Sequence, residues 1–116
     1  GLLRLPRQIP SRIAMELALT GDFISAERAY ELGMINRVVE PGNALDGARA
    51  LATAIAANGP LALIASKQII RESQDWSQDE MFDKQNAIAN PVFTSEDAIE
   101  GATAFAEKRP PQWKGR

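Results

Sequence analysis

Apolar residues recur at helical spacing along most of the chain. Between residues 44 and 57 they fall on one stripe, at positions 45, 48, 51, 52, 55 and 56. Helical patterns bounded by polar and turn-forming residues predict further helices, over residues 12–19, 26–32, 61–72, 77–90 and 95–109. A high alanine content favours helix over strand. The chain is therefore predicted to be mainly α-helical.

Capping residues set the expected ends of these helices. Ser11 and Ser25 are predicted N-caps, and Ser77 with Glu80 three residues later matches a capping box. Thr20-Gly21 and Gly33 are expected to end two of the early helices, Gly33 in the left-handed conformation. A proline at position 60 is tolerated in the first turn of the next helix. The fourth helix of the second half is expected to follow Asn90-Pro91.

One segment differs from this helical pattern. Residues 34–39 (MINRVV) form the only run rich in β-branched side chains, so they are the single strand candidate. Pro41-Gly42 predicts a turn immediately afterwards. We place the main boundary there, between residues 1–40 and residues 43–116. The four predicted helices after it, joined by short connections, suggest a small bundle.

The last predicted helix carries the most informative pair of side chains. Thr94 and Asp97 match a capping pattern, and two prolines after Arg109 stop the helix. Phe105 and Lys108 are three residues apart, so an aromatic ring and an ammonium group share one side. They could hold an aromatic ligand that bears phosphate. The simpler interpretation is that Phe105 is a core residue and that Lys108 and Arg109 complement the helix dipole.

Composition excludes several classes of function. The net charge of −2 argues against general nucleic-acid binding. The chain contains no cysteine and no histidine, which removes disulfides, thiolate and Ser-His catalysis, and most zinc or iron sites. No apolar run reaches the length of a membrane-spanning helix, and no signal peptide opens the chain. A cytoplasmic protein is expected, and a removed targeting segment would leave no trace.

Carboxylates are plentiful, and pairs of them could in principle perform acid–base chemistry. Glu96 and Glu100 share one helix face, and Asp79 and Asp83 share another. Their neighbours are polar, so we expect them to be solvated, with nothing to raise a pKa toward a catalytic value. We therefore assign no catalytic residue to this chain.

Three segments together resemble a known family. They are LTGDFISAERAYELGMINRVV at 19–39, IAANGPLALIASK at 55–67, and FTSEDAIEGATAFAEKRPPQWKGR at 93–116. In this order and spacing they resemble the C-terminal part of the enoyl-CoA hydratase (crotonase) family, over essentially the entire chain. We expect the chain to be a fragment of a longer protein.

The resemblance implies an architecture and a reaction. Members have an α/β spiral core of ββα units, followed by helices that mediate trimer formation, often with two trimers stacked into a hexamer. Residues 1–40 resemble the last part of that core, and residues 43–116 resemble the trimerisation helices. Members of the family act in fatty acid metabolism and hydrate a trans-2-enoyl-CoA to a 3-hydroxyacyl-CoA. Two glutamates and two backbone amides perform this reaction. The resemblance implies a CoA thioester as substrate, with no metal or redox cofactor and no membrane insertion.

The resemblance also locates the chain relative to the family's active site. Both glutamates and both amides precede the point that matches Gly1, so no carboxylate here inherits a catalytic role. Phe105 and Lys108 match last-helix positions that contact CoA bound in a neighbouring subunit. Other reactions of the family remain open: double-bond isomerisation, dehalogenation and acyl-CoA hydrolysis. A stand-alone helical oligomerisation module without catalysis is the alternative of another class.

Overall fold

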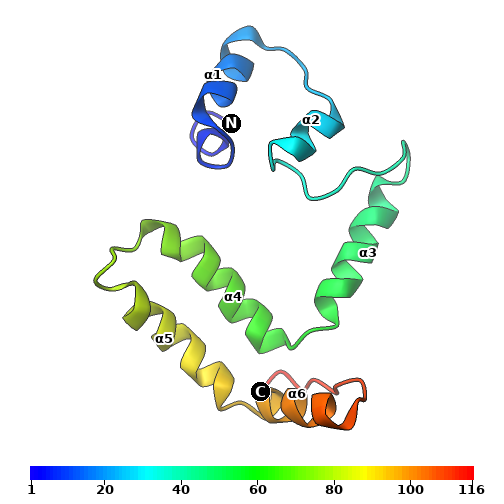
Figure 1. Ribbon diagram of the computed structural model, residues 1–116, viewed down its shortest axis with the longest axis vertical. Coiled ribbons are helices and arrows are strands. Elements are labelled where there is room, and N and C mark those ends of the chain that lie inside the picture. The colour runs from blue at the N-terminus through cyan, green and yellow to red at the C-terminus, as the bar shows by residue number, and fades with distance from the viewer. The chain divides into compact units, whose positions relative to one another are not determined.

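The computed structural model describes all 116 residues, and every regular element in it is helical. The chain divides into two compact units, Gly1–Ala50 and Leu51–Arg116. Figure 1 labels the α-helices in chain order: α1 Ser11–Thr20, α2 Ala26–Glu31, α3 Ala44–Ala56, α4 Pro60–Glu72, α5 Met81–Phe93 and α6 Glu96–Glu107. Two short 3-10 turns, η1 Leu5–Arg7 and η2 Ser73–Asp75, complete the list. The prediction of a mainly helical chain is confirmed.

Several predicted helix ends are confirmed. The hydroxyl of Ser25 accepts a hydrogen bond from the backbone N–H of Arg28 at 3.1 Å, as expected for an N-cap of α2. Gly21 and Gly33 adopt φ values of 72° and 74°, the left-handed conformation in which glycine ends a helix without strain. Pro60 occupies the first turn of α4, where its missing N–H has no partner to lose.

Two capping predictions are wrong. Pro10 is the N-cap of α1, and Ser11 already lies inside the helix with no capping bond from its side chain. The helix predicted from residue 77 begins only at Met81. Half of the capping box is nevertheless present, because Oε1 of Glu80 accepts the backbone N–H of Ser77 at 3.3 Å. This helix also continues past Pro91 to residue 93.

The strand predicted at residues 34–39 is also wrong. This segment contains no strand, and the chain contains none elsewhere. A strand is stable only when its N–H and C=O groups bond to a neighbouring strand, and this helical chain offers no such partner. The apolar side chains of the segment stay 36 to 40% exposed, at Met34, Ile35, Val38 and Val39.

The second unit is not a closed bundle. Helices α4 and α5 pack along each other and run antiparallel, and α5 contacts α6 (Figure 1). The only buried apolar residues in this unit are Ala65 and Ala104, and no large side chain in the chain is fully buried. Large apolar side chains such as Ile64, Phe93 and Phe105 remain mostly exposed. The predicted small bundle with a shared apolar core is therefore not formed.

No single helix is both long and apolar enough to cross a bilayer. Only the bent pair of Ala44–Ala56 with Pro60–Asp75 meets the requirement when the two are counted together, by length and composition.

Candidate functional site

The start of α6 differs by one residue from the sequence prediction. Ser95 is the N-cap: its hydroxyl accepts the backbone N–H of Ala98 at 3.1 Å and donates to the carbonyl of Val92 at 2.6 Å. Thr94 instead ends α5, and its hydroxyl donates to the carbonyl of Pro91 at 3.2 Å. Two adjacent hydroxyl residues compete for one cap, and only Ser95 has the extended backbone that capping requires.

Asp97 does not complete a capping box but holds the end of the chain. The residue is only 4% exposed, and its carboxylate accepts the backbone N–H groups of Lys114 at 2.6 Å and Gly115 at 2.9 Å. Its own N–H donates to the carbonyl of Arg116 at 3.1 Å. Residues 109–116, which we call the tail, are therefore bonded to the first turn of α6.

An ion pair holds the other end of the tail. The guanidinium of Arg109 donates to both carboxylate oxygens of Glu100, at 2.6 and 3.0 Å. Glu100 also accepts the backbone N–H of Gln112 at 2.7 Å. The hydrogen bond from Arg109, followed by that from Gln112, lowers the pKa of Glu100 to about 2. This carboxylate therefore stays ionised at neutral pH, and it is not poised as a general acid.

Glu96 behaves in the same way. It pairs with Lys114 at 3.1 Å and Arg116 at 3.3 Å, and the hydrogen bond from Lys114 is the main reason that its pKa lies below the usual value. The expectation that no pKa on this helix face is raised toward a catalytic value holds for Glu96 and Glu100, whose pKa values are lowered. What the sequence did not predict is that the tail supplies their partners.

Trp113 lies against two glycines. Its indole N–H donates to the carbonyl of Ala57 at 2.9 Å. A Cβ atom added at Gly101 would lie 3.2 Å from the ring, and one added at Gly59 would lie 3.5 Å from it. The sequence contained a signal of this contact, because a glycine inside a helix costs about 1 kcal/mol relative to alanine and often marks close approach.

Phe105 and Lys108 lie where α6 ends. Phe105 is 88% exposed, so the interpretation that it is a core residue is not met within this chain. The helix stops at Glu107, and Lys108 is its C-cap residue, at φ 54° and ψ 39°. Lys108 is exposed and makes no ion pair with any other residue of the chain. The structure thus leaves an aromatic ring and an ammonium group available near the same helix end, and their role as ligand contacts stays a prediction.

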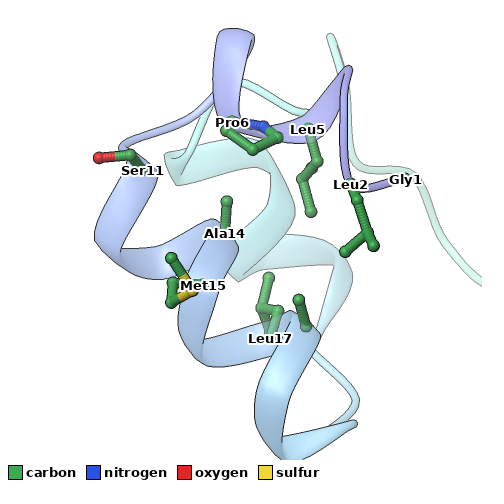
Figure 2. A pocket seen from close by; sticks show the side chains of 9 residues that line it. Gly1, Leu2, Leu5, Pro6, Ser11, Ala14, Met15 and Leu17 are labelled. Atoms are coloured by element: carbon green, nitrogen blue, oxygen red, sulfur yellow. The ribbon is translucent and has the colours of Figure 1, made fainter.

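The first unit contains an apolar pocket of about 490 Å³, shown in Figure 2. Leu5 and Pro6 lie on one side of it, and Ala14, Met15 and Leu17 of α1 lie on the other. No charged side chain lines it, so it can accept apolar groups but offers no acid, base or metal ligand. Across the chain, no group of acidic residues is placed to bind a metal ion.

Comparison with known proteins agrees with the sequence resemblance. The profile of the enoyl-CoA hydratase/isomerase family matches residues 1–116. A carnitinyl-CoA dehydratase from Salmonella arizonae is 43% identical over 119 residues, covering 99% of this chain and 46% of that relative. An enoyl-CoA hydratase from Mycobacterium tuberculosis is 48% identical over 114 residues, covering 98% of this chain and 43% of that relative.

Solved structures show the same similarity in three dimensions. The crystal structure of an enoyl-CoA hydratase from Mycobacterium marinum superposes with a TM-score of 0.97 at 65% identity, over 100% of this chain and 46% of that one. One from Mycobacterium tuberculosis H37Rv gives a TM-score of 0.97 at 64% identity, with the same coverage. The chain therefore spans less than half the length of the proteins it matches, and its helical fold corresponds to a helical part of theirs. The chain belongs to the enoyl-CoA hydratase/isomerase family.

Proposed function

We propose that this chain is the C-terminal part of an enoyl-CoA hydratase, which adds water to a trans-2-enoyl-CoA to give a 3-hydroxyacyl-CoA. In that protein the residues of this chain would form contacts between subunits and one side of the CoA site. The observation that carries the proposal is the match along the entire chain, at 64 to 65% identity, to solved structures described as enoyl-CoA hydratases. A cytoplasmic location and a role in fatty acid metabolism belong to the same proposal.

The proposal assigns the chemistry to residues outside this chain. A catalytic carboxylate needs a desolvated setting and a pKa near the working pH. Glu100 is held ionised by Arg109, with a pKa of about 2, and the buried Asp97 is occupied by two backbone N–H groups. Both oxygens of each carboxylate already accept hydrogen bonds from the tail. We therefore propose that the carboxylates here are structural.

Phe105 and Lys108 are the proposed CoA contacts. An exposed aromatic ring can stack on adenine, and an ammonium group without an ion-pair partner can approach phosphate oxygens. Both conditions hold here, since Phe105 is 88% exposed and Lys108 makes no ion pair. We propose that the ligand they contact is bound in a neighbouring subunit of a homotrimer or hexamer.

Assembly is supported by the apolar side chains that the chain leaves uncovered. Phe82 and Phe93 of α5 are 62 and 75% exposed, and Ile99 of α6 is 67% exposed. Large apolar surface left exposed to solvent is typical of protein interfaces. If the chain instead worked as a stand-alone module, it would self-associate through these side chains without binding CoA.

A second reaction is favoured by one observation. Carnitinyl-CoA dehydratases are among the relatives at 42 to 43% identity. Their name describes the removal of water from a hydroxylated acyl-CoA, which is the reverse chemical sense on a different substrate. The assay should therefore include both an enoyl-CoA and a carnitinyl-CoA. Isomerisation, dehalogenation and thioester hydrolysis are distinguished by their products.

The test uses the protein that contains this chain, with crotonyl-CoA as substrate. We expect Lys108→Ala to raise KM about tenfold, the equivalent of about 1.4 kcal/mol for one lost ammonium–phosphate contact, with kcat unchanged. Lys67→Ala, which removes an exposed lysine from α4, is the matched control and should leave both constants unchanged. Absence of hydration by the unmodified protein would refute the proposed reaction. An unchanged KM in the Lys108 variant would remove Lys108 from the CoA site.

A further inference from the structure

Lys108 has an unusual backbone conformation. It is the only non-glycine residue in the chain with a positive φ, at 54°. For a residue with a Cβ atom this left-handed conformation is unfavourable, and helices usually place glycine at such a position. The surrounding residues must therefore hold it there, and the contacts on each side of Lys108 show how.

Arg109 connects the two sides of this turn. Its Nε donates to Oε2 of Glu107 at 2.6 Å, so the residues immediately before and after Lys108 are joined by an ion pair. The rest of its guanidinium forms the two bonds to Glu100, two turns earlier in α6. Its backbone N–H also donates to the carbonyl of Ala104 at 3.0 Å. Arg109 thus fastens the residue after the turn to the body of the helix.

Lys108 and Arg109 lie in the same turn but differ in their charged neighbours, and this difference gives them different roles. Two carboxylates neutralise Arg109, and its donors already point at them, so it has little left to offer a phosphate group. Lys108 has no carboxylate partner and projects from a turn that Arg109 fixes. A flexible lysine side chain binds more tightly when the backbone beneath it is fixed, because less freedom is lost on binding.

We infer that Arg109, through Glu107 and Glu100, is a positioning residue that holds the left-handed turn and so aims Lys108 at a phosphate of the CoA substrate. This inference rests on the proposed function, because it needs CoA as the ligand. It adds a residue that acts without touching that ligand. The requirement is for arginine: a lysine at 109 could not bind both oxygens of Glu100 and the carboxylate of Glu107 together.

A double-mutant cycle tests this directly, with CoA binding to the full-length protein measured by calorimetry. We expect Lys108→Ala and Arg109→Gln each to weaken CoA binding about five- to tenfold. The double variant should bind CoA no more weakly than Lys108→Ala alone, because Arg109 acts only through Lys108. Effects of the two substitutions that multiply would overturn the inference and would indicate that Arg109 contacts the ligand itself. An unchanged affinity in Arg109→Gln would overturn it as well.

Three controls separate positioning from general damage to the fold. Arg109→Lys should bind CoA as weakly as Arg109→Gln, and full rescue by lysine would contradict the geometry. Arg28→Gln removes another surface ion pair, that with Glu31 at 2.9 Å, and should leave CoA binding unchanged. The third control uses crotonyl-pantetheine as substrate, which lacks the nucleotide phosphates. Arg109→Gln should have the same kcat/KM as the unmodified protein with this substrate. An equal loss of kcat/KM with crotonyl-pantetheine and with crotonyl-CoA would mean damage to the fold.

The same cycle distinguishes this inference from the proposed function. If Lys108→Ala leaves CoA binding unchanged, the CoA role of Lys108 fails, and the positioning role fails with it. If Lys108→Ala weakens binding but Arg109→Gln does not, only the positioning role fails. Glu107→Gln perturbs the same turn more mildly. We expect it to weaken CoA binding in the unmodified protein and to have no further effect on CoA binding in the Lys108→Ala variant.

Discussion

Replacing Asp97 by asparagine should release the tail from α6. The carboxylate of Asp97 accepts two backbone N–H groups, those of Lys114 at 2.6 Å and Gly115 at 2.9 Å. An asparagine of the same shape has one oxygen and one NH₂ group. Only one of the two tail amides can then find an acceptor, and the other faces a donor.

The magnitude follows from the kind of bond that is lost. A hydrogen bond to a charged group contributes about 1.5–3 kcal/mol, and a neutral one contributes about 1 kcal/mol. Lys114 and Gly115 are exposed, so the amide that loses its partner can be hydrated once the tail moves. We therefore expect the substitution to reduce the free energy of tail docking by about 2 kcal/mol, in the lower part of the range for hydrogen bonds to charged groups. A change of 1.4 kcal/mol corresponds to a factor of ten, so the opened tail should become roughly 30-fold more populated.

Amide hydrogen exchange measures this opening at the residues concerned. Exchange at the amides of Lys114 and Gly115 should become about 30-fold faster in Asp97→Asn, either in the 116-residue chain or in a longer protein that contains it. Asp83→Asn is the matched control: Asp83 is exposed and its carboxylate makes no ion pair, so its loss should change stability by less than about 0.5 kcal/mol. Exchange rates that agree within threefold between Asp97→Asn and the unmodified chain would refute the reasoning.

Two further predictions concern the same tail. The pKa of Glu100 is lowered from 4.5 to about 2, so its contribution to tail docking is fully present above pH 4.5 and is lost as the pH falls toward 2. Amide exchange rates of the tail, corrected for their intrinsic pH dependence, should show this loss. Loss of tail docking when the pH is raised from 5 to 8 would contradict the prediction. Gly101→Leu introduces a better helix former into α6 but places carbons where a Cβ alone already lies 3.2 Å from the Trp113 ring, so it should displace the ring and break its bond to Ala57. In a Trp76→Phe background, iodide should then quench Trp113 more strongly, whereas Thr103→Leu on an exposed position should leave the quenching unchanged.

The features that could be predicted from the sequence are those set by neighbouring residues. Ser25 caps α2 and Gly33 adopts the left-handed conformation because each depends on contacts within four or five residues. Predictions were wrong where two neighbouring residues could each cap the same helix, as with Thr94 and Ser95. They were also wrong where the element needs a second strand to bond to, as at residues 34–39. A strand-like sequence forms a strand only if another strand bonds to it.

The candidate site could be read from the sequence only in part, for a similar reason. Phe105 and Lys108 were singled out because they are close in sequence and match the family pattern, and their role as CoA contacts stays a prediction. The tail contacts could not, since they join residues far apart: Trp113 bonds to Ala57, and Lys114 bonds to Asp97. Nothing in helix periodicity encodes such pairings. Only Gly101 gave a local hint that another part of the chain approaches the helix.

The left-handed turn at Lys108 and the CoA contact proposed for this residue favour different side chains at position 108. A side chain with a Cβ atom costs at least about 1 kcal/mol there, and glycine would relieve that cost. Selection for thermal stability alone should therefore replace Lys108 with glycine or asparagine, whereas selection for growth on an acyl-CoA substrate should retain the lysine. Engineering of this protein for heat resistance should leave position 108 unchanged and draw its gains from other positions.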